Sequence, residues 1–190
     1  MNSILNGKVY SHELDEWLVS WESESEYRHW CHQTKKQFAE NILVVMFNPG
    51  NLSGDGKNLR SDTTLRILRN VCESAGVNPF VVNLFDYASP SPDVLFSRWV
   101  KRDGGGLIYD KLGALKIAAY IMAYGDYENR GERDNDIKER IALVQSHLTG
   151  IKEIILPKNS SGTPKHPMSW QRQKIMPTIS KLIAVGIAKN

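Results

Sequence analysis

An asparagine that follows an apolar run is the side chain in this sequence best placed to do chemistry. Asn48 comes directly after the run 42–47 and is followed by Pro49 and Gly50. Proline has no amide hydrogen and ends a central strand, and glycine allows a ligand to come close to the backbone. Ligands of open α/β sheets bind beyond the carboxyl ends of the strands. We therefore predict that Asn48 faces a ligand.

A second asparagine lies near the end of another apolar run, at Asn83 within residues 80–85. A buried amide costs free energy unless its hydrogen bonds are made. Two interpretations stay open for Asn83. It forms a structural hydrogen bond to a neighbouring loop, or its amide reads the polar edge of a ligand.

The carboxyl-terminal part of the chain combines a histidine with a basic segment. From residue 158 onward the side chains include six cations and no carboxylate, namely Lys158, Lys165, Arg172, Lys174, Lys181 and Lys189. Such a segment is typical of a surface that faces phosphates, and equally of a solvated face. His166 lies inside it, and a neutral imidazole donates one hydrogen bond.

Two other polar clusters do not amount to sites. The stretch 54–57 contains two glycines and a lysine but lacks the spacing of a P-loop. His29, Cys31 and His32 resemble metal ligands, but a zinc site needs more ligands, and Cys72 alone does not complete one. We expect no metal and no cofactor.

Four predicted strands alternate with helices along the chain. The strands are placed at residues 42–47, 80–85, 117–123 and 152–156. This alternation predicts a three-layer α/β/α sandwich with a four-stranded, mostly parallel sheet, formed by a single domain over residues 1–190. Its polar loops would meet at one edge of the sheet.

The helices have recognisable ends in the sequence. Ser61 is the expected N-cap of a helix that runs to Ala75 and is ended by Gly76. The segment 11–36 is predicted to be helical from the spacing of its aromatic residues. A last helix, 170–187, is expected to be interrupted near Pro177.

Composition narrows the class of protein. The chain has 190 residues, of which 41% are hydrophobic and 24% charged, with a net charge of +3 and two cysteines. It contains no apolar run of the roughly 20 residues that span a membrane and no signal-peptide pattern at its start. We expect a cytoplasmic monomer that does not bind membranes.

Several segments resemble a bacterial family known as domain of unknown function 1643. They are Tyr27-Arg28-His29-Trp30, Met46-Phe47-Asn48-Pro49, Asp62-Thr63-Thr64-Leu65-Arg66, Val82-Asn83-Leu84-Phe85 and Gly162-Thr163-Pro164-Lys165-His166-Pro167-Met168. The resemblance covers about residues 27–168. The usual pattern of that family begins Leu-Asn-Pro-Ser, so Gly50 and the longer loop behind it are departures.

A more distant resemblance carries more chemistry. The order of Asn-Pro-Gly after strand one, Asn after strand two and His-Pro after strand four is similar to the uracil-DNA glycosylase superfamily, whose mismatch-specific branch also has Asn-Pro-Gly. That resemblance implies that Asn48 positions the attacking water. It also implies that His166 and Pro167 belong to a second catalytic motif with a loop that penetrates DNA.

The chemistry of base excision fits these residue types. Cleavage leaves positive charge on the sugar and negative charge on the base. An asparagine can orient the water, which needs little activation, and a neutral histidine can donate to the base oxygen. Base flipping also needs a pocket, a stacking face and a wedge. Expected to contact the base are Phe47, Pro49, Gly50, Asn83, Phe85 and Tyr87. Expected to contact DNA are Lys158, Lys165, Pro167, Met168, Trp170 and Arg172.

The sequence therefore predicts a monofunctional DNA glycosylase that acts on a damaged or modified base. A hypermodified phage pyrimidine is one such base, and the protein would then act in defence. No lysine is placed to form a Schiff base, so lyase activity is not expected. Two alternatives stay open: a non-catalytic module that binds nucleotides or nucleic acid, and an enzyme that acts on free nucleosides.

Overall fold

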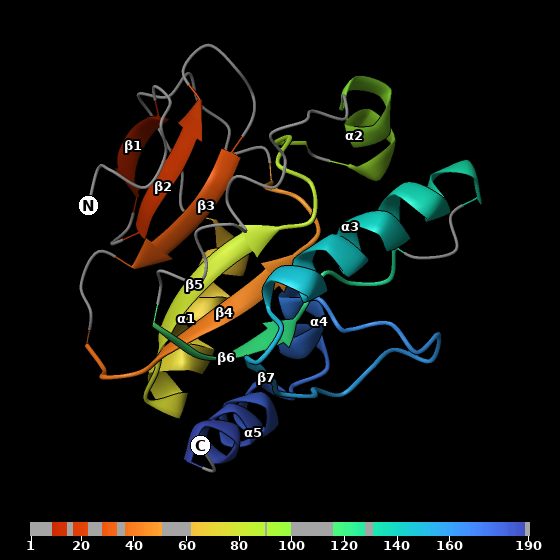
Figure 1. Cartoon of the computed structure of the whole chain (residues 1–190). Coiled ribbons are helices and arrows are strands. Elements are labelled where there is room, and N and C mark those ends of the chain that lie inside the picture. Colours follow the sequence, from red (N-terminus) through yellow and green to blue (C-terminus); the bar gives the residue numbers. More distant parts are fainter. Residues whose placement is uncertain are drawn as a thin grey trace.

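The protein folds around one mixed β-sheet with helices on both faces (Figure 1). The computed structural model describes residues 9–14, 17–22, 28–33, 37–50, 62–89, 91–99, 116–127 and 131–188. Within these residues the sheet has seven strands in the order β1-β2-β3-β5-β4-β6-β7. None of the helices in these ranges is long and apolar enough to cross a membrane.

The four predicted strands form the parallel part of the sheet. They are β4 (Asn41–Met46), β5 (Asn78–Asn83), β6 (Ile117–Met122) and β7 (Lys152–Glu153). Strand β4 pairs with β5 on one side and with β6 on the other, and β6 pairs with β7. The residues after β4 therefore leave the sheet from an interior strand, as the apolar run ahead of Asn48 predicts.

The predicted helix over residues 11–36 is wrong. This region contains three antiparallel strands, β1 (Val9–Leu14), β2 (Trp17–Glu22) and β3 (Arg28–Gln33), and β3 joins the parallel part by pairing with β5. The expectation of a four-stranded sheet is therefore also corrected, because the described residues form seven strands. In β2, aromatic and β-branched residues recur at every second position, which is the period of a strand and is favoured there.

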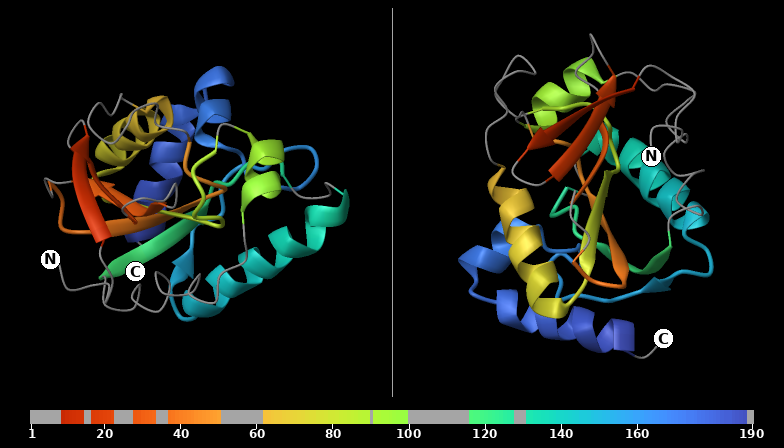
Figure 2. Two further views of the ribbon diagram at one scale, coloured as in Figure 1. Left: turned by 90° about the horizontal axis from the view of Figure 1, so that it is seen from above. Right: turned by 90° about the vertical axis from the view of Figure 1, so that its left-hand side faces the viewer.

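Alternating side chains of the parallel strands supply both layers of the core. Ile42, Val44 and Met46 of β4 pack on one side, in a cluster with α1 (Thr63–Ala75), α4 (Pro167–Arg172) and α5 (Met176–Ala188). Residues 43, 45 and 47 pack on the other side against α2 (Pro92–Arg98) and α3 (Asp134–His147). The three layers of the predicted sandwich are visible from above and from the side (Figure 2).

Two predicted helix ends are corrected by one to four residues. The N-cap of α1 is Asp62, because its carboxylate accepts hydrogen bonds from the first helical amides, and Ser61 lies outside the described residues. Gly76 ends α1 as expected, with a left-handed φ of 73°. The last predicted helix is two helices, and the break lies at residues 173–175, where Lys174 has a φ of 57°. Pro177 instead lies in the first turn of α5, where proline is tolerated.

Candidate active site

The segments after three parallel strands begin side by side at the carboxyl edge of the sheet. The backbone ladder continues past the strand ends, with N–H···O distances of 2.8 Å from Leu84 to Met46 and 2.9 Å from Phe85 to Phe47. On the other side of β4, the amide of Ala123 donates to Val45 at 2.8 Å. The loops after β4 and β5 therefore start at the same edge, and so does the loop after β7, because β7 is parallel to β6.

Asn48 is held by two hydrogen bonds that fix its amide. Its Nδ2 donates to the carbonyl oxygen of Ser89 at 3.0 Å and to that of Pro49 at 2.9 Å. The amide of Ser89 donates in turn to the Pro49 oxygen at 3.0 Å, which ties the loops after β4 and β5 together. Both amide hydrogens are thus directed at carbonyl oxygens, and no described residue donates to Oδ1. The oxygen of Asn48 is an oriented acceptor.

Asp62 lies beside the Asn-Pro-Gly turn. Its Oδ1 caps α1 by accepting from the amides of Thr64 at 2.7 Å and Leu65 at 3.3 Å. Its Oδ2 faces the turn, because a Cβ atom built on Gly50 would lie 3.6 Å from that oxygen. In the sequence Asp62 opens the Asp-Thr-Thr-Leu-Arg motif at the start of a helix, and it was not among the predicted site residues. The sequence does contain one indication of its role: Asp62 is a carboxylate at the start of the helix that follows Asn48, so it must lie close to the site.

His166 is a neutral hydrogen-bond donor at the same edge. It is the N-cap of α4, and its Nδ1 accepts from the amide of Met168 at 3.2 Å. Because Nδ1 is an acceptor, the ring proton is on Nε2. Burial lowers the pKa of His166 to about 4, although the charge of Asp62 raises it and that of Arg172 lowers it. The ring is therefore neutral near pH 7, as the sequence analysis expected for a donor.

This lowered pKa predicts an acid-sensitive contribution to stability. An unfolded histidine, with a pKa near 6.5, binds its proton before the folded one does, so stability falls as the pH is lowered from about 6.5 to about 4. The slope is at most about 1.4 kcal/mol per pH unit. Denaturant unfolding of wild type and His166→Asn at several pH values measures it, since asparagine keeps the cap without titrating. Identical pH dependence in the two proteins would contradict the prediction.

Gly125 permits the close packing of the segment after β6 against His166. Its φ of 91° is left-handed, and a Cβ atom there would lie 3.1 Å from Cε2 of Tyr127 and 3.3 Å from Cβ of His166. These approaches leave no room for a larger side chain. His166, which comes from the loop after β7, is thereby placed next to the end of β6.

The predicted stacking residues are buried in the free protein. Phe47 is 1% exposed, Phe85 is fully buried and Tyr87 is 5% exposed. Tyr127 covers one face of Phe47, with ring centroids 4.1 Å apart and planes inclined by 24°, and Phe85 meets Phe47 edge-on at 5.2 Å. Tyr127 therefore covers one face of Phe47, a ring that was predicted to stack on the base. The base contacts of Phe47, Phe85 and Tyr87 stay predictions. Tyr127 was not among the residues predicted to contact the base.

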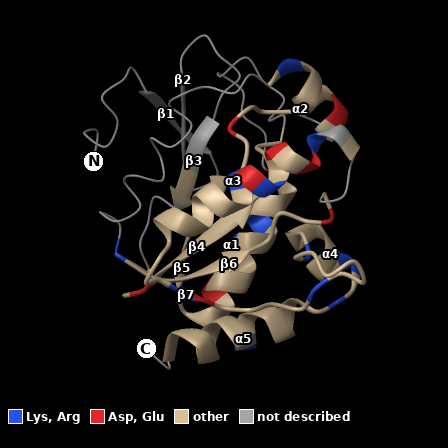
Figure 3. Cartoon of the chain, turned by 45° about the vertical axis from the view of Figure 1, so that its right-hand side comes forward, with Lys and Arg blue, Asp and Glu red and all other residues tan. Residues whose placement is uncertain are grey.

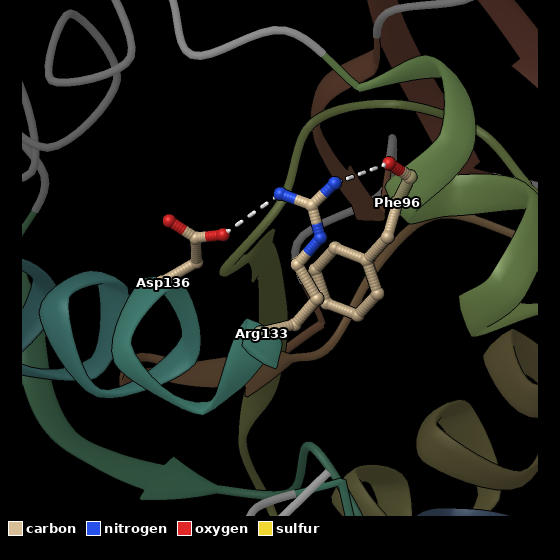
Figure 4. A network of polar contacts seen from close by, with 3 residues as sticks. All are labelled: Phe96, Arg133 and Asp136. Carbon is tan, nitrogen blue, oxygen red and sulfur yellow. Dashed lines mark hydrogen bonds and ion pairs between the residues drawn. The ribbon is translucent and has the colours of Figure 1, made fainter. Parts of the chain in front are cut away.

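A polar contact between α2 and Arg133, the residue just ahead of α3, braces the cluster of Phe47, Phe85 and Phe96 (Figure 4). Arg133 donates to the carbonyl oxygen of Phe96 at 3.0 Å and pairs with Asp136 at 3.2 Å. Its guanidinium carbon also lies 5.5 Å from the ring centroid of Phe96. The ring of Phe96 meets both Phe47 and Phe85 edge-on. This contact therefore helps to fix the rings beneath the Asn48 turn.

The remaining predicted base contacts differ in exposure. Pro49 is buried while Gly50 is exposed. Asn83, the last residue of β5, lies opposite Met46 and is 9% exposed. Gly50 is therefore the most accessible part of the Asn-Pro-Gly turn, and both interpretations of Asn83 remain predictions.

The residues predicted to contact DNA are not all at the surface. Lys158 and Arg172 are exposed, and Lys165 and Met168 are partly buried. Pro167 is buried. Trp170 is fully buried in the core cluster that also contains the apolar residues of α1. The expectation that Trp170 contacts DNA is corrected, because a fully buried core side chain cannot reach a base stack. Figure 3 shows basic residues on and next to α4.

The loop between β7 and α4 is fastened to the end of β6. Oδ1 of Asp126 accepts from the hydroxyls of Ser161 at 2.7 Å and Thr163 at 2.9 Å. Asn159 closes the loop by donating to Oγ1 of Thr163 and to the oxygen of Pro164, both at 3.0 Å. These bonds fix the segment between Lys158 and His166. They keep it at the same edge of the sheet as Asn48.

Fold and site together define an α/β protein with a polar site beyond the carboxyl ends of parallel strands. Residues 27–168 match the model of a family described as protein of unknown function (DUF1643). The chain belongs to this family. The matched region contains Asn48, Asp62 and His166. A comparison with curated proteins gives no match.

Proposed function

We propose that this protein is a monofunctional DNA glycosylase that hydrolyses the N-glycosidic bond of a damaged or modified base and leaves an abasic site. One observation supports this above the others. An oriented acceptor, Oδ1 of Asn48, and a neutral donor, Nε2 of His166, belong to loops that begin at one edge of the sheet. Asn48 and His166 also belong to the motifs whose order along the chain resembles that of the uracil-DNA glycosylase superfamily.

The two groups match the charges that develop in the reaction. As the bond breaks, the sugar becomes electrophilic and the base gains negative charge. Asn48 binds the water that adds to the sugar, and because the sugar is already electron-poor, a weakly basic amide suffices to orient it. His166 donates a hydrogen bond to the oxygen of the departing base, where its effect is greatest in the transition state.

The accepted base is proposed to be modified rather than unmodified. Gly50 stands where the family pattern has serine, and it is exposed beside Asn48. The absence of a side chain at this position favours a bulky base, such as the hypermodified pyrimidines of phage DNA. In that case the protein acts in antiviral defence. The longer loop behind Gly50, residues 51–60, lies outside the described residues.

The function is tested by incubating the purified protein with DNAs that carry diverse modified bases and scoring abasic sites. Release of one base from DNA supports the proposal. Cleavage of free nucleosides but not of DNA would replace it with the alternative enzyme. DNA binding without release of any base would favour the non-catalytic module.

We predict that DNA binding weakens steeply with salt and depends on Lys165 and Arg172, which flank the His166 loop. Each phosphate that a cation neutralises releases a condensed counterion, so removal of one such cation lowers the slope of log affinity against log salt by roughly one. Titration of the double variant Lys165→Gln/Arg172→Gln at several salt concentrations measures this slope. Lys116→Gln is the matched control, because Lys116 is exposed at the opposite end of β6. An unchanged slope in the double variant would place the DNA surface elsewhere.

A further inference from the structure

We propose that Asp62 is the catalytic carboxylate that accepts the proton of the attacking water. Asn48 holds the water, and Asp62 makes it nucleophilic. This inference rests on the proposed glycosylase function and adds to it a residue that neither resemblance assigns to the reaction.

The two oxygens of Asp62 have different surroundings. Capping of α1 uses Oδ1, which accepts from the amides of Thr64 and Leu65. No described residue donates to Oδ2. Instead, Oδ2 faces the turn that carries Asn48, at 3.6 Å from the position of a Cβ atom on Gly50. A helix cap needs one oxygen, so the second is a fixed acceptor directed at the site.

Asp62 is also coupled to the other catalytic group. Its negative charge favours the protonated form of His166 and raises the pKa of that ring against the effect of burial. This Coulombic coupling places Asp62 in the neighbourhood of the His166 ring, and its Oδ2 lies against the turn that carries Asn48. A carboxylate there also stabilises the positive charge that develops on the sugar.

Two other carboxylates near this edge are less suited to the role. Oδ1 of Asp126 accepts from Ser161 and Thr163, and this side chain fastens the loop ahead of His166. Asp86 is only 8% exposed, which shields it from water. Asp62 is the carboxylate whose described contacts place it against the Asn-Pro-Gly turn.

The proposed step balances in atoms and charge. The water oxygen forms a bond to the anomeric carbon, and the carbon–nitrogen bond breaks with its electron pair going to the base. The water proton passes to Oδ2 of Asp62, which later returns it to solvent. The base anion is held by the Nε2 hydrogen of His166 until solvent protonates it.

The test is Asp62→Asn, measured in single-turnover excision from the DNA on which wild type is active. Asparagine keeps an oxygen for the cap of α1 but replaces the basic oxygen with an amide nitrogen. We expect the melting temperature to stay near that of wild type and the rate to fall roughly 10²-fold, within the range of a positioned base. Asp62→Ala should lose the same activity and also melt at a lower temperature.

Two controls separate the possible causes of a loss. Asp93→Asn removes one negative charge from an exposed position in α2 and should leave the rate unchanged. NMR titration of His166 needs no substrate: its pKa should fall further in Asp62→Asn than in wild type, because a charge that raises it is gone.

The outcomes distinguish this inference from the proposed function. A folded Asp62→Asn protein as active as wild type overturns the role of Asp62 alone. An unchanged pKa of His166 in that variant overturns the juxtaposition on which the role depends. A wild-type protein that releases no base from any DNA overturns the proposed function, and the role of Asp62 with it.

Discussion

Asn48→Ala is expected to abolish abasic-site formation while the protein stays folded. The substitution removes the acceptor that holds the water and also the hydrogen bonds from Nδ2 to Pro49 and Ser89. The loss in single-turnover rate should be the largest of any single substitution in the site, at least roughly 10³-fold, because both the position and the orientation of the nucleophile are lost.

The fold should survive because the strand does not depend on this side chain. The apolar residues of β4 are buried between both helical layers, and Asn48 follows them in a partly exposed turn. Backbone bonds from Leu84 and Phe85 still join the turn to the segment after β5. The cost in stability should be that of removing hydrogen bonds at a partly exposed turn, about 1 kcal/mol each.

Asn41→Ala is the matched control for this experiment. Asn41 is the same residue type at the opposite end of β4, and its Nδ2 also donates to a carbonyl oxygen, that of Lys116, at 3.0 Å. It should lose similar stability and no activity. Full activity in a folded Asn48→Ala protein would remove Asn48 from the mechanism and with it the main support for a glycosylase.

The parallel part of the sheet could be predicted because its strands are buried on both faces. The run 42–47 is apolar at every position, which is typical of a strand buried on both faces, and the following Pro49 marks its end. The segment 11–36 gave no such signal. Its tryptophans fit helical and strand spacings alike, and the pairing of β3 with β5 joins residues about 50 positions apart. Contacts at that separation leave no local trace in the sequence.

Part of the candidate site could be predicted because it follows strands that the sequence indicates clearly. Asn48 and His166 lie in loops whose position follows from strand ends, so their place at one edge could be expected. Asp62 was missed because a place at the start of a helix is a sufficient explanation for an aspartate, and only the fold shows that Oδ2 faces Gly50. Trp170 was misjudged because a tryptophan beside a site is either core or surface, and packing decides which.

His166→Ala is expected to lower the rate of the chemical step by roughly 10²-fold or more, the effect of losing one donor to a developing anion. The effect should be on the single-turnover rate rather than on DNA binding, because the base oxygen carries more charge in the transition state than in the bound substrate. Rapid-quench measurements on the DNA identified in the substrate screen give this rate.

The loss of the donor can be separated from the loss of the cap on α4. His166→Asn keeps an acceptor for the amide of Met168 but has no Nε2 hydrogen, so it should be as inactive as the alanine variant and more stable. His147→Ala is the matched control, since His147 ends α3 just ahead of β7, at the opposite edge of the sheet. If both variants of His166 keep the wild-type rate, the ring only caps α4, and the base must leave without a donor from this loop.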